Sequence, residues 1–114
     1  MPVEAGSLLA GLPPAARADE QVDMLLARPG VRLLRIVSTG QVTPDGDWYD
    51  QDDDEWVVVI AGAADLLVEG EAAPRSLAPG GWIYLPAHCR HRVVATDDAT
   101  PTVWLALHMA PTSG

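Results

Sequence analysis

Two stretches decide the fold of this 114-residue chain: Trp48–Gly62, WYDQDDDEWVVVIAG, and Gly80–His91, GGWIYLPAHCRH. The first contains an aromatic pair, an acidic run and a β-branched segment that ends at a glycine. The second contains a short apolar segment between two glycines and a proline, and then two histidines. Val and Ile favour a pleated backbone, whereas Gly and Pro interrupt it. Together the stretches predict a small β-barrel with a pocket inside.

The composition narrows the class of protein. The length favours one domain, and ten Gly and ten Pro favour short strands over long helices. The net charge of −9 disfavours binding to nucleic acid and to anionic membranes. No apolar run has the roughly 18 residues of a membrane span, and the first twenty residues lack the pattern of a signal peptide. Because Cys89 is the single cysteine, no intramolecular disulfide can form, and a cytoplasmic location is expected.

Short segments with strand propensity follow one another through most of the chain. An Ala- and Pro-rich arm at residues 1–19, with one helical turn at Ser7–Leu12, is expected to precede a single domain at residues 20–114. A helix over residues 15–27 competes with the first strand. Repeated strands and turns predict an all-β barrel or sandwich, with a hairpin joining the third and fourth strands. The expected strands are Gln21–Ala27, Val31–Ser38, Glu55–Ala61, Ala64–Val68, Arg75–Leu77, Trp82–Leu85, His91–Thr96 and Thr102–Met109.

The first stretch resembles the first motif of the cupin superfamily. Glu55, six residues and then Gly62 fit the second half of that motif. The two histidine positions of the motif fall on Tyr49 and Gln51.

The second stretch resembles the second cupin motif. Gly80, Pro86 and His91 have the spacing of that motif, and His88 stands where the motif has a glycine. The match covers roughly residues 31–109. The resemblance implies a jelly-roll β-barrel with an internal pocket, commonly a homodimer.

The resemblance also implies where a metal would bind. The usual cupin site takes two His and a Glu from the first motif and a His from the second. Here only Glu55 and His91 stand at matching positions, and Tyr49 and Gln51 are poor replacements for imidazole ligands.

A hairpin argument adds a second histidine to the expected site. If the last two strands turn at Asp98–Ala99, His91 lies opposite His108, with Cβ atoms about 5 Å apart. In this arrangement both rings enter the barrel, and His88 lies at its mouth.

Glu55 heads a strand whose inward residues would be Glu55, Val57 and Val59, and a buried carboxylate needs a partner. We therefore expect a divalent metal (Fe, Mn, Ni or Zn) held by Glu55, His91, His108 and His88. The alternative is a metal-free network in which Glu55 contacts His91 or Tyr49.

Other side chains are candidates for chemistry or for binding. His88 and Tyr49 are the candidate catalytic residues, since histidine titrates near neutral pH. The candidate pocket residues are Gln51, Tyr84, Trp104 and Trp48.

Three further features have simpler interpretations. The aspartates at residues 50–54 predict a solvated hairpin turn, because the run lacks the glycine and the closing glutamate of an EF-hand loop. Cys89 is expected to be an ordinary thiol. The alternating residues Trp56, Val58 and Ile60 would point outward, and this apolar set indicates burial against a second subunit.

Three functions remain open. The first is a metal-dependent enzyme of dioxygenase, isomerase, lyase or decarboxylase type that acts on a small molecule. The second is a metal-free ligand-binding module or sensor, which the absence of the two motif histidines favours. The third is a structural homodimer that serves a larger pathway.

Overall fold

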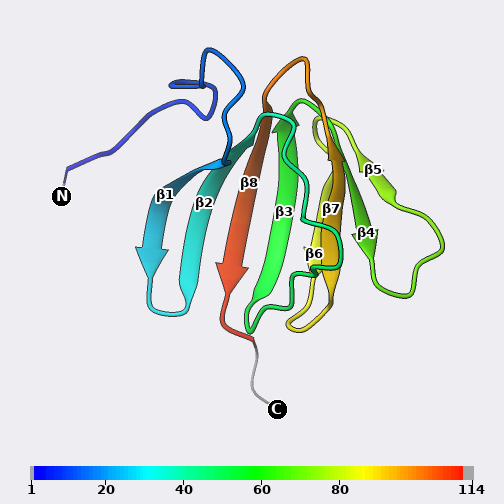
Figure 1. The fold of residues 1–114 in the computed structure, drawn as a ribbon. Coiled ribbons are helices and arrows are strands. Elements are labelled where there is room, and N and C mark those ends of the chain that lie inside the picture. Colours follow the sequence, from blue (N-terminus) through cyan, green and yellow to red (C-terminus); the bar gives the residue numbers. More distant parts are fainter. Residues whose placement is uncertain (1, 112–114) are drawn as a thin grey trace.

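The computed structural model describes residues 2–111, and they form an all-β domain (Figure 1). None of these residues lies in a helix, so none belongs to a helix long and apolar enough to cross a membrane. The expected strands are confirmed with small changes at their ends. They are β1 (Gln21–Arg28), β2 (Val31–Ser38), β3 (Asp54–Ala61), β4 (Ala64–Val68), β5 (Arg75–Leu77), β6 (Trp82–Leu85), β7 (His91–Thr96) and β8 (Thr102–Met109).

The strands form two antiparallel sheets, seen side by side in Figure 1. One has five strands in the order β1-β2-β8-β3-β6, and the other has three in the order β5-β4-β7. The core lies between them: Val59, Trp104 and Ala106 of the larger sheet pack with Ala64 and Leu77 of the smaller. This is the jelly-roll arrangement that the sequence predicted.

Two predicted hairpins are wrong. β3 and β4 lie in different sheets, and so do β7 and β8, so neither pair forms a ladder. β8 pairs with β2 and β3 instead, and β7 pairs with β4. Consecutive strands of a jelly roll cross from one sheet to the other. A short turn between two strands has the same local sequence signals in either case, so pairing could not be deduced from them.

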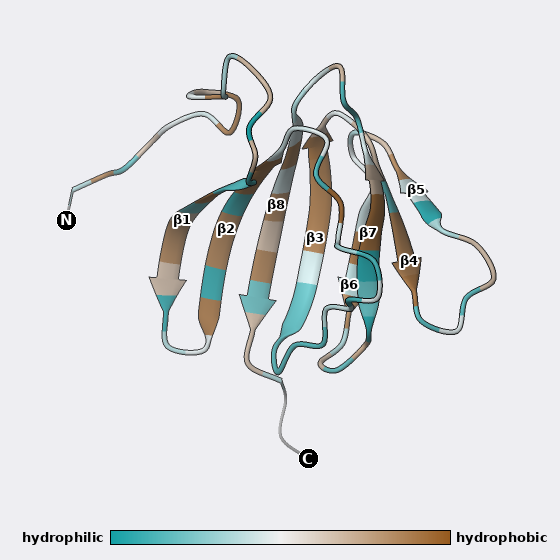
Figure 2. Cartoon of the chain, viewed as in Figure 1, coloured by the Kyte–Doolittle hydropathy of each residue, from teal (hydrophilic) through white to brown (hydrophobic). Residues whose placement is uncertain are grey.

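The inward set predicted for β3 is confirmed. Glu55, Val57 and Val59 are buried, and the residues between them are partly exposed. This alternation follows from the pleat, which sends successive side chains to opposite faces of the sheet. Figure 2 shows hydrophilic residues at the lower ends of β3 and β7 and close to the lower end of β8, while the upper parts of β3 and β7 are mostly apolar. The barrel therefore has a polar end that opens onto an apolar core.

The N-terminal arm packs on the outside of β2. The side chain of Arg35 is buried, donates to the carbonyl oxygens of Leu8 and Ala10, and forms an ion pair with Asp23 at 2.7 Å. Ser7 and Ala10 close a turn. The helix considered for residues 15–27 does not form, because residues from Gln21 onward pair with β2.

Residues 41–51 run along the free edge of β7. The amide of Thr43 donates to the carbonyl of Val93 at 2.9 Å, and Tyr49 and His91 exchange two backbone hydrogen bonds. These contacts cover an edge that would otherwise expose unpaired backbone groups. They also bring Tyr49 and Gln51 to the polar end of the barrel.

Candidate functional site

A cavity of about 170 Å³ lies between the sheets at the polar end of the barrel. Its lining combines an apolar wall with a group of polar side chains, the usual composition of a small-molecule site. The apolar wall is Ile36, Val57, Leu66, Leu85, Val93 and Trp104. The polar group is Glu20, Tyr49, Gln51, Glu55, His91 and His108.

Glu55 and His108 are brought together by strand register. They are directly paired across β3 and β8, and both are 8% exposed. The Nε2 atom of His108 lies 3.4 Å from Oε2 of Glu55. His108 Nδ1 is buried and has no hydrogen-bond partner among the described residues. Leaving such a nitrogen unpaired costs free energy, so a water molecule or a ligand atom is the expected partner.

His91 reaches the same carboxylate from the opposite sheet. Its Nδ1 atom lies 2.8 Å from the carbonyl oxygen of Cys89, and a carbonyl can only accept, so Nδ1 carries a proton. This fixes the ring with Nε2 toward Glu55, 3.7 Å from Oε1. The prediction that both His91 and His108 enter the barrel is therefore confirmed. They meet through Glu55, and the predicted pairing of His91 with His108 across one hairpin is wrong.

Tyr49 and Gln51, which occupy the two histidine positions of the motif, complete this group. Gln51 donates its side-chain amide to Oε1 of Glu55 at 3.1 Å. The ring of Tyr49 stacks on that of His91, with the centroids 5.5 Å apart. Burial, and then the negative charge of Glu20, raise the pKa of Tyr49, and Glu55 adds to the shift against a hydrogen bond from Thr43. Tyr49 therefore remains a phenol at neutral pH and can donate a hydrogen bond.

Glu20 is a cavity residue that the sequence did not indicate. It lies directly before β1, at the end of the arm, and its carboxylate accepts a hydrogen bond from Ser38. Ser38 in turn accepts from the indole nitrogen of Trp104 at 3.0 Å. Glu20 precedes the region that resembles the cupin motifs, and a glutamate where the Ala- and Pro-rich arm meets β1 carries no local signal of burial.

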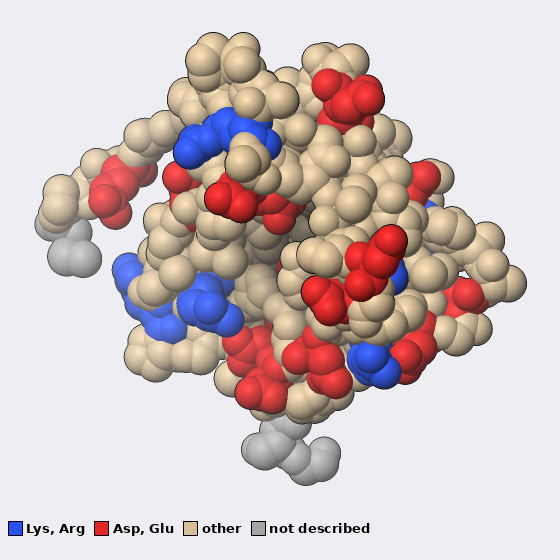
Figure 3. Space-filling model, viewed as in Figure 1, with Lys and Arg blue, Asp and Glu red and all other residues tan. Residues whose placement is uncertain are grey.

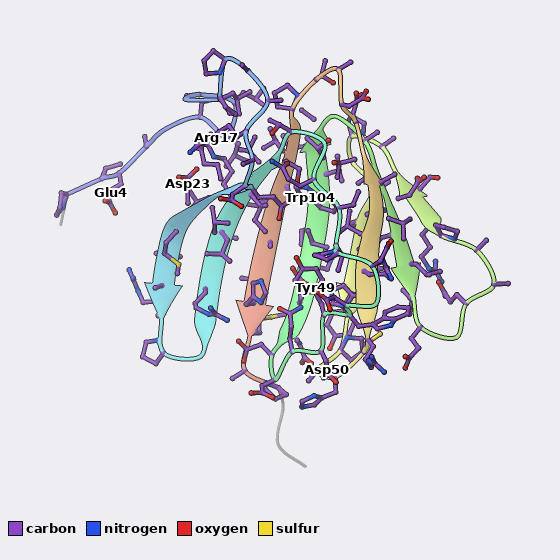
Figure 4. The ribbon with its side chains drawn as sticks, viewed as in Figure 1. Glu4, Arg17, Asp23, Tyr49, Asp50 and Trp104 are labelled. Carbon is purple, nitrogen blue, oxygen red and sulfur yellow. The ribbon has the colours of Figure 1, made fainter. Side chains whose placement is uncertain are left out.

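Three expected site residues lie outside the cavity lining. The side chain of His88 is 63% exposed, and its Nδ1 lies 2.7 Å from Asp50. Trp48 lies beneath the guanidinium groups of Arg90 and Arg92. Tyr84 is on the outer face of the larger sheet, where it pairs with Trp56. In Figure 4, Asp50, the partner of His88, lies at the lower end of the barrel, below the cavity residues Tyr49 and Trp104.

The acidic run contributes more than solvation. Asp53 forms an ion pair with Arg32 at 2.8 Å, and Asp54 accepts from the backbone amide of Ala87. Together with the contact between Asp50 and His88, these bonds hold the ends of both motif stretches against each other. The run is therefore part of what shapes the entrance to the cavity.

The donor set can be compared with the needs of a metal ion. Glu55, His91 and His108 offer one carboxylate and two imidazoles, which are ligands of Zn and related ions. The separations of 3.4 and 3.7 Å are close to those between two ligands on one tetrahedral ion, about 3.4 Å for bonds of about 2.1 Å. However, each ring faces a different oxygen of Glu55, and no group of three or more His, Cys, Asp or Glu among the described residues has metal-binding geometry. The chemistry of the donors fits a metal, whereas their present arrangement centres on Glu55 itself.

The comparisons with known proteins agree with this fold. The sequence matches the cupin domain family over residues 35–108, so the chain belongs to the cupins. A solved structure from Ralstonia eutropha JMP134, described as a candidate mannose-6-phosphate isomerase, shares 48% identity at a TM-score of 0.91. The match covers 94% of this chain and 98% of that one.

More distant structures share the fold alone. KdgF from a Halomonas species is 22% identical, with a TM-score of 0.69 over 84% of each chain. A cupin superfamily protein from Desulfitobacterium hafniense DCB-2 is 17% identical, with a TM-score of 0.73 over 96% of this chain and 94% of that one. No curated protein matches the chain.

Proposed function

We propose that this cupin binds a small molecule in the cavity and catalyses an isomerase or lyase type of reaction there, with a divalent metal ion. The observation that carries the proposal is the buried Glu55 carboxylate beside the Nε2 atoms of His91 and His108. A carboxylate can accept a proton from a substrate and imidazoles can accept or donate one, as both reaction types require. The description of the Ralstonia relative favours the isomerase type over the dioxygenase type.

Different side chains have different roles in the proposed proton transfer. Gln51 holds Oε1 of Glu55, so Oε2 is the oxygen that can accept a proton from a substrate carbon next to a carbonyl. The phenol of Tyr49 donates to the substrate oxygen on which negative charge develops. Return of the proton to the former carbonyl carbon, together with passage of the neighbouring hydroxyl proton to the former carbonyl oxygen, completes an isomerisation. A divalent ion would be held by Glu55, His91 and His108, and would polarise the same substrate oxygen.

Metal content and metal-induced stabilisation test the proposal. Protein purified without a His tag should contain close to one Fe, Mn, Ni or Zn per chain. A metal at 100 times its Kd should add about 2.7 kcal/mol to the free energy of unfolding. Glu55→Gln and His91→Ala should remove this effect, whereas the surface change Arg75→Gln should keep it. Less than about 0.1 metal per chain, with no rise in melting temperature on adding any of the four ions, would contradict the proposal.

A second candidate is a metal-free binding module. The hydrogen bond from Gln51 to Glu55 and the stacking of Tyr49 on His91 favour it, because they join the site into a network without an ion. This function predicts that small molecules raise the melting temperature of metal-free protein and that His91→Ala abolishes the rise. If small molecules raise the melting temperature only after metal is added, the result would favour the metal-dependent enzyme. The cytoplasmic location stays a prediction.

A further inference from the structure

We propose that the cavity selects a small hydroxylated ligand that carries no phosphate or carboxylate, and that Glu20 sets this selectivity. The inference rests on the proposed function in one respect, namely that the cavity is where the ligand binds. Within that function it names the class of substrate and adds a specificity residue from the arm.

The charge of the cavity is the first support. Two carboxylates, those of Glu20 and Glu55, line it, and no arginine is among the described lining residues. The chain contains no lysine at all. A phosphate or carboxylate on the ligand would lose its water and meet like charges, with no lysine or arginine in the described lining to offset them.

The arginines near the entrance have other partners. Arg32 forms an ion pair with Asp53 at 2.8 Å, and Arg17 reaches the side chain of Gln21. Figure 3 shows a hollow near the centre of one face, with acidic atoms along much of its border and basic atoms farther out. An anion approaching the hollow therefore meets negative charge at its rim as well as inside it.

The hydrogen-bonding groups of the cavity are the second support. Glu20 uses Oε2 to accept from Ser38, and Glu55 uses Oε1 to accept from Gln51. Glu20 keeps its Oε1 for a donor, and hydroxyl groups are donors, whereas Oε2 of Glu55 faces Nε2 of His108 at 3.4 Å. The apolar wall, with the ring of Trp104, suits the C–H faces of a short polyol or sugar. Hydroxyls of such a ligand would replace the waters that otherwise fill a polar cavity.

Size is the third support. The cavity of about 170 Å³ is close to the engineered cavity of about 150 Å³ that holds benzene. It therefore encloses a ligand of about six non-hydrogen atoms, such as a three- or four-carbon sugar. A phosphoryl group would have to remain at the acidic rim.

Glu20 is held firmly enough to act as a selectivity residue. The arm just before it is tied to the domain by two bonds: the amide of Arg17 donates to Thr39 at 2.9 Å, and Gln41 donates to the carbonyl of Arg17 at 2.7 Å. After Glu20 the chain enters β1, whose first residue pairs with Val37. The backbone is thus held on both sides of Glu20, the bond from Ser38 holds its carboxylate, and the end of the arm forms one wall of the site.

Dihydroxyacetone and dihydroxyacetone phosphate are a matched pair of probes, since they differ only in the phosphoryl group. Binding is followed by the indole N–H signal of Trp104 in ¹H–¹⁵N spectra, because this group bonds to Ser38 beside Glu20. The unphosphorylated probe should bind the wild type at least about tenfold more tightly. Glu20→Gln, whose amide oxygen can still accept from Ser38, should reduce the preference to less than about threefold. Glu20→Asp, which keeps the charge, and the surface change Glu71→Gln should both retain it.

Equal or tighter binding of the phosphorylated probe to the wild type would overturn the inference. So would an unchanged preference in Glu20→Gln, or no movement of the Trp104 signal with either probe up to about 100 mM, the range expected for such small ligands. These outcomes are distinct from failure of the proposed function, which is judged by metal content and metal-induced stabilisation in the Glu55 and His91 variants.

Discussion

At the scale of single residues, His88 combines an unusual backbone with a charged contact. Its φ of 62° is the only positive value of a non-glycine residue in the described chain. A side chain in this conformation is strained, and a glycine would remove the strain. His88 gains instead a bond to Asp50 at 2.7 Å, and its backbone amide donates to the carbonyl of Gln51. A residue outside the cavity thus helps to hold the loop that carries two cavity residues.

This contact predicts a pH-dependent stability. The hydrogen bond that the imidazole of His88 donates to the carboxylate of Asp50 raises the pKa of His88 above its ordinary 6.5. Desolvation opposes this rise, and the charges of Asp50 and Asp52 add to it. A raised histidine pKa stabilises the fold fully below the unfolded pKa, and the effect is lost as pH rises through the folded pKa. We compare the wild type with His88→Asn, because Asn tolerates positive φ and does not titrate. The melting temperature of the wild type relative to the variant should be highest near about pH 5.5 and should fall by about pH 8.5.

His88→Gly separates strain from charge in the same experiment. Glycine removes the strain at every pH. The difference in melting temperature between His88→Gly and His88→Asn should therefore not depend on pH. If the wild type exceeds His88→Asn in melting temperature by the same amount at both pH values, a role for the bond between His88 and Asp50 would be contradicted.

Among single residues, the sequence predicted several of the side chains that line the cavity, and the residues it missed or misplaced have physical explanations. The motif spacing identified Glu55 and His91 because spacing fixes which residues share a face of the barrel. It could not show that His88 turns outward, since that depends on a backbone conformation that is unusual for histidine. It could not find Glu20, whose burial depends on where the arm crosses the domain. The expected residues that line the cavity are Tyr49, Gln51, Glu55, His91, Trp104 and His108.

At the scale of elements, Gly62 is the joint where the chain leaves β3 and crosses to the other sheet. Its φ is +83°, and a Cβ added there would lie 2.5 Å from Oγ1 of Thr102 and 2.6 Å from its Cα atom. Because the Cα atom of β8 cannot swing aside, an added methyl group must move a strand. Backbone strain and overpacking together predict that Gly62→Ala lowers the free energy of unfolding by about 2 to 5 kcal/mol. Urea denaturation measures the change.

Gly70 provides a matched control. Its φ is +91°, but a Cβ there would meet nothing within 4 Å. Gly70→Ala should therefore cost only the backbone strain, about 1 to 2 kcal/mol. Equal losses in the two variants would show that the contact with Thr102 adds nothing.

The crossover at Gly62 also shows how far elements could be predicted. The strands were found because β-branched runs between Gly and Pro signals are local features. Their partners are not local. Trp104 of β8 pairs with Val59 of β3, 45 positions earlier, and with Ile36 of β2, 68 positions earlier. Which sheet a strand joins depends on packing across the whole barrel. The sequences of the adjacent turns do not determine it.

At the scale of the whole molecule, the outer face of the larger sheet is apolar across its full width. One row of paired residues crosses all five strands: Leu26, Leu33, Leu107, Trp56 and Tyr84. Next to it, Trp82 is 59% exposed and stacks on Trp56 with the centroids 5.8 Å apart. Charged side chains are depleted and aromatic ones enriched at the centres of protein interfaces. This face is therefore where we expect a second copy of the chain to bind.

Trp82→Glu tests this expectation. A buried aromatic anchor at an interface is worth about 2 kcal/mol or more, so the variant should raise the dimer dissociation constant at least about 30-fold in sedimentation velocity. Val42→Glu adds the same charge at an exposed loop residue and should leave the dimer intact. Because side chains alternate across a strand, Trp82 faces away from the cavity, and the Trp104 indole signal should be the same in the monomeric variant. A wild type that sediments as a monomer would contradict the expected dimer, and a changed Trp104 signal would show that the outer face and the cavity are coupled.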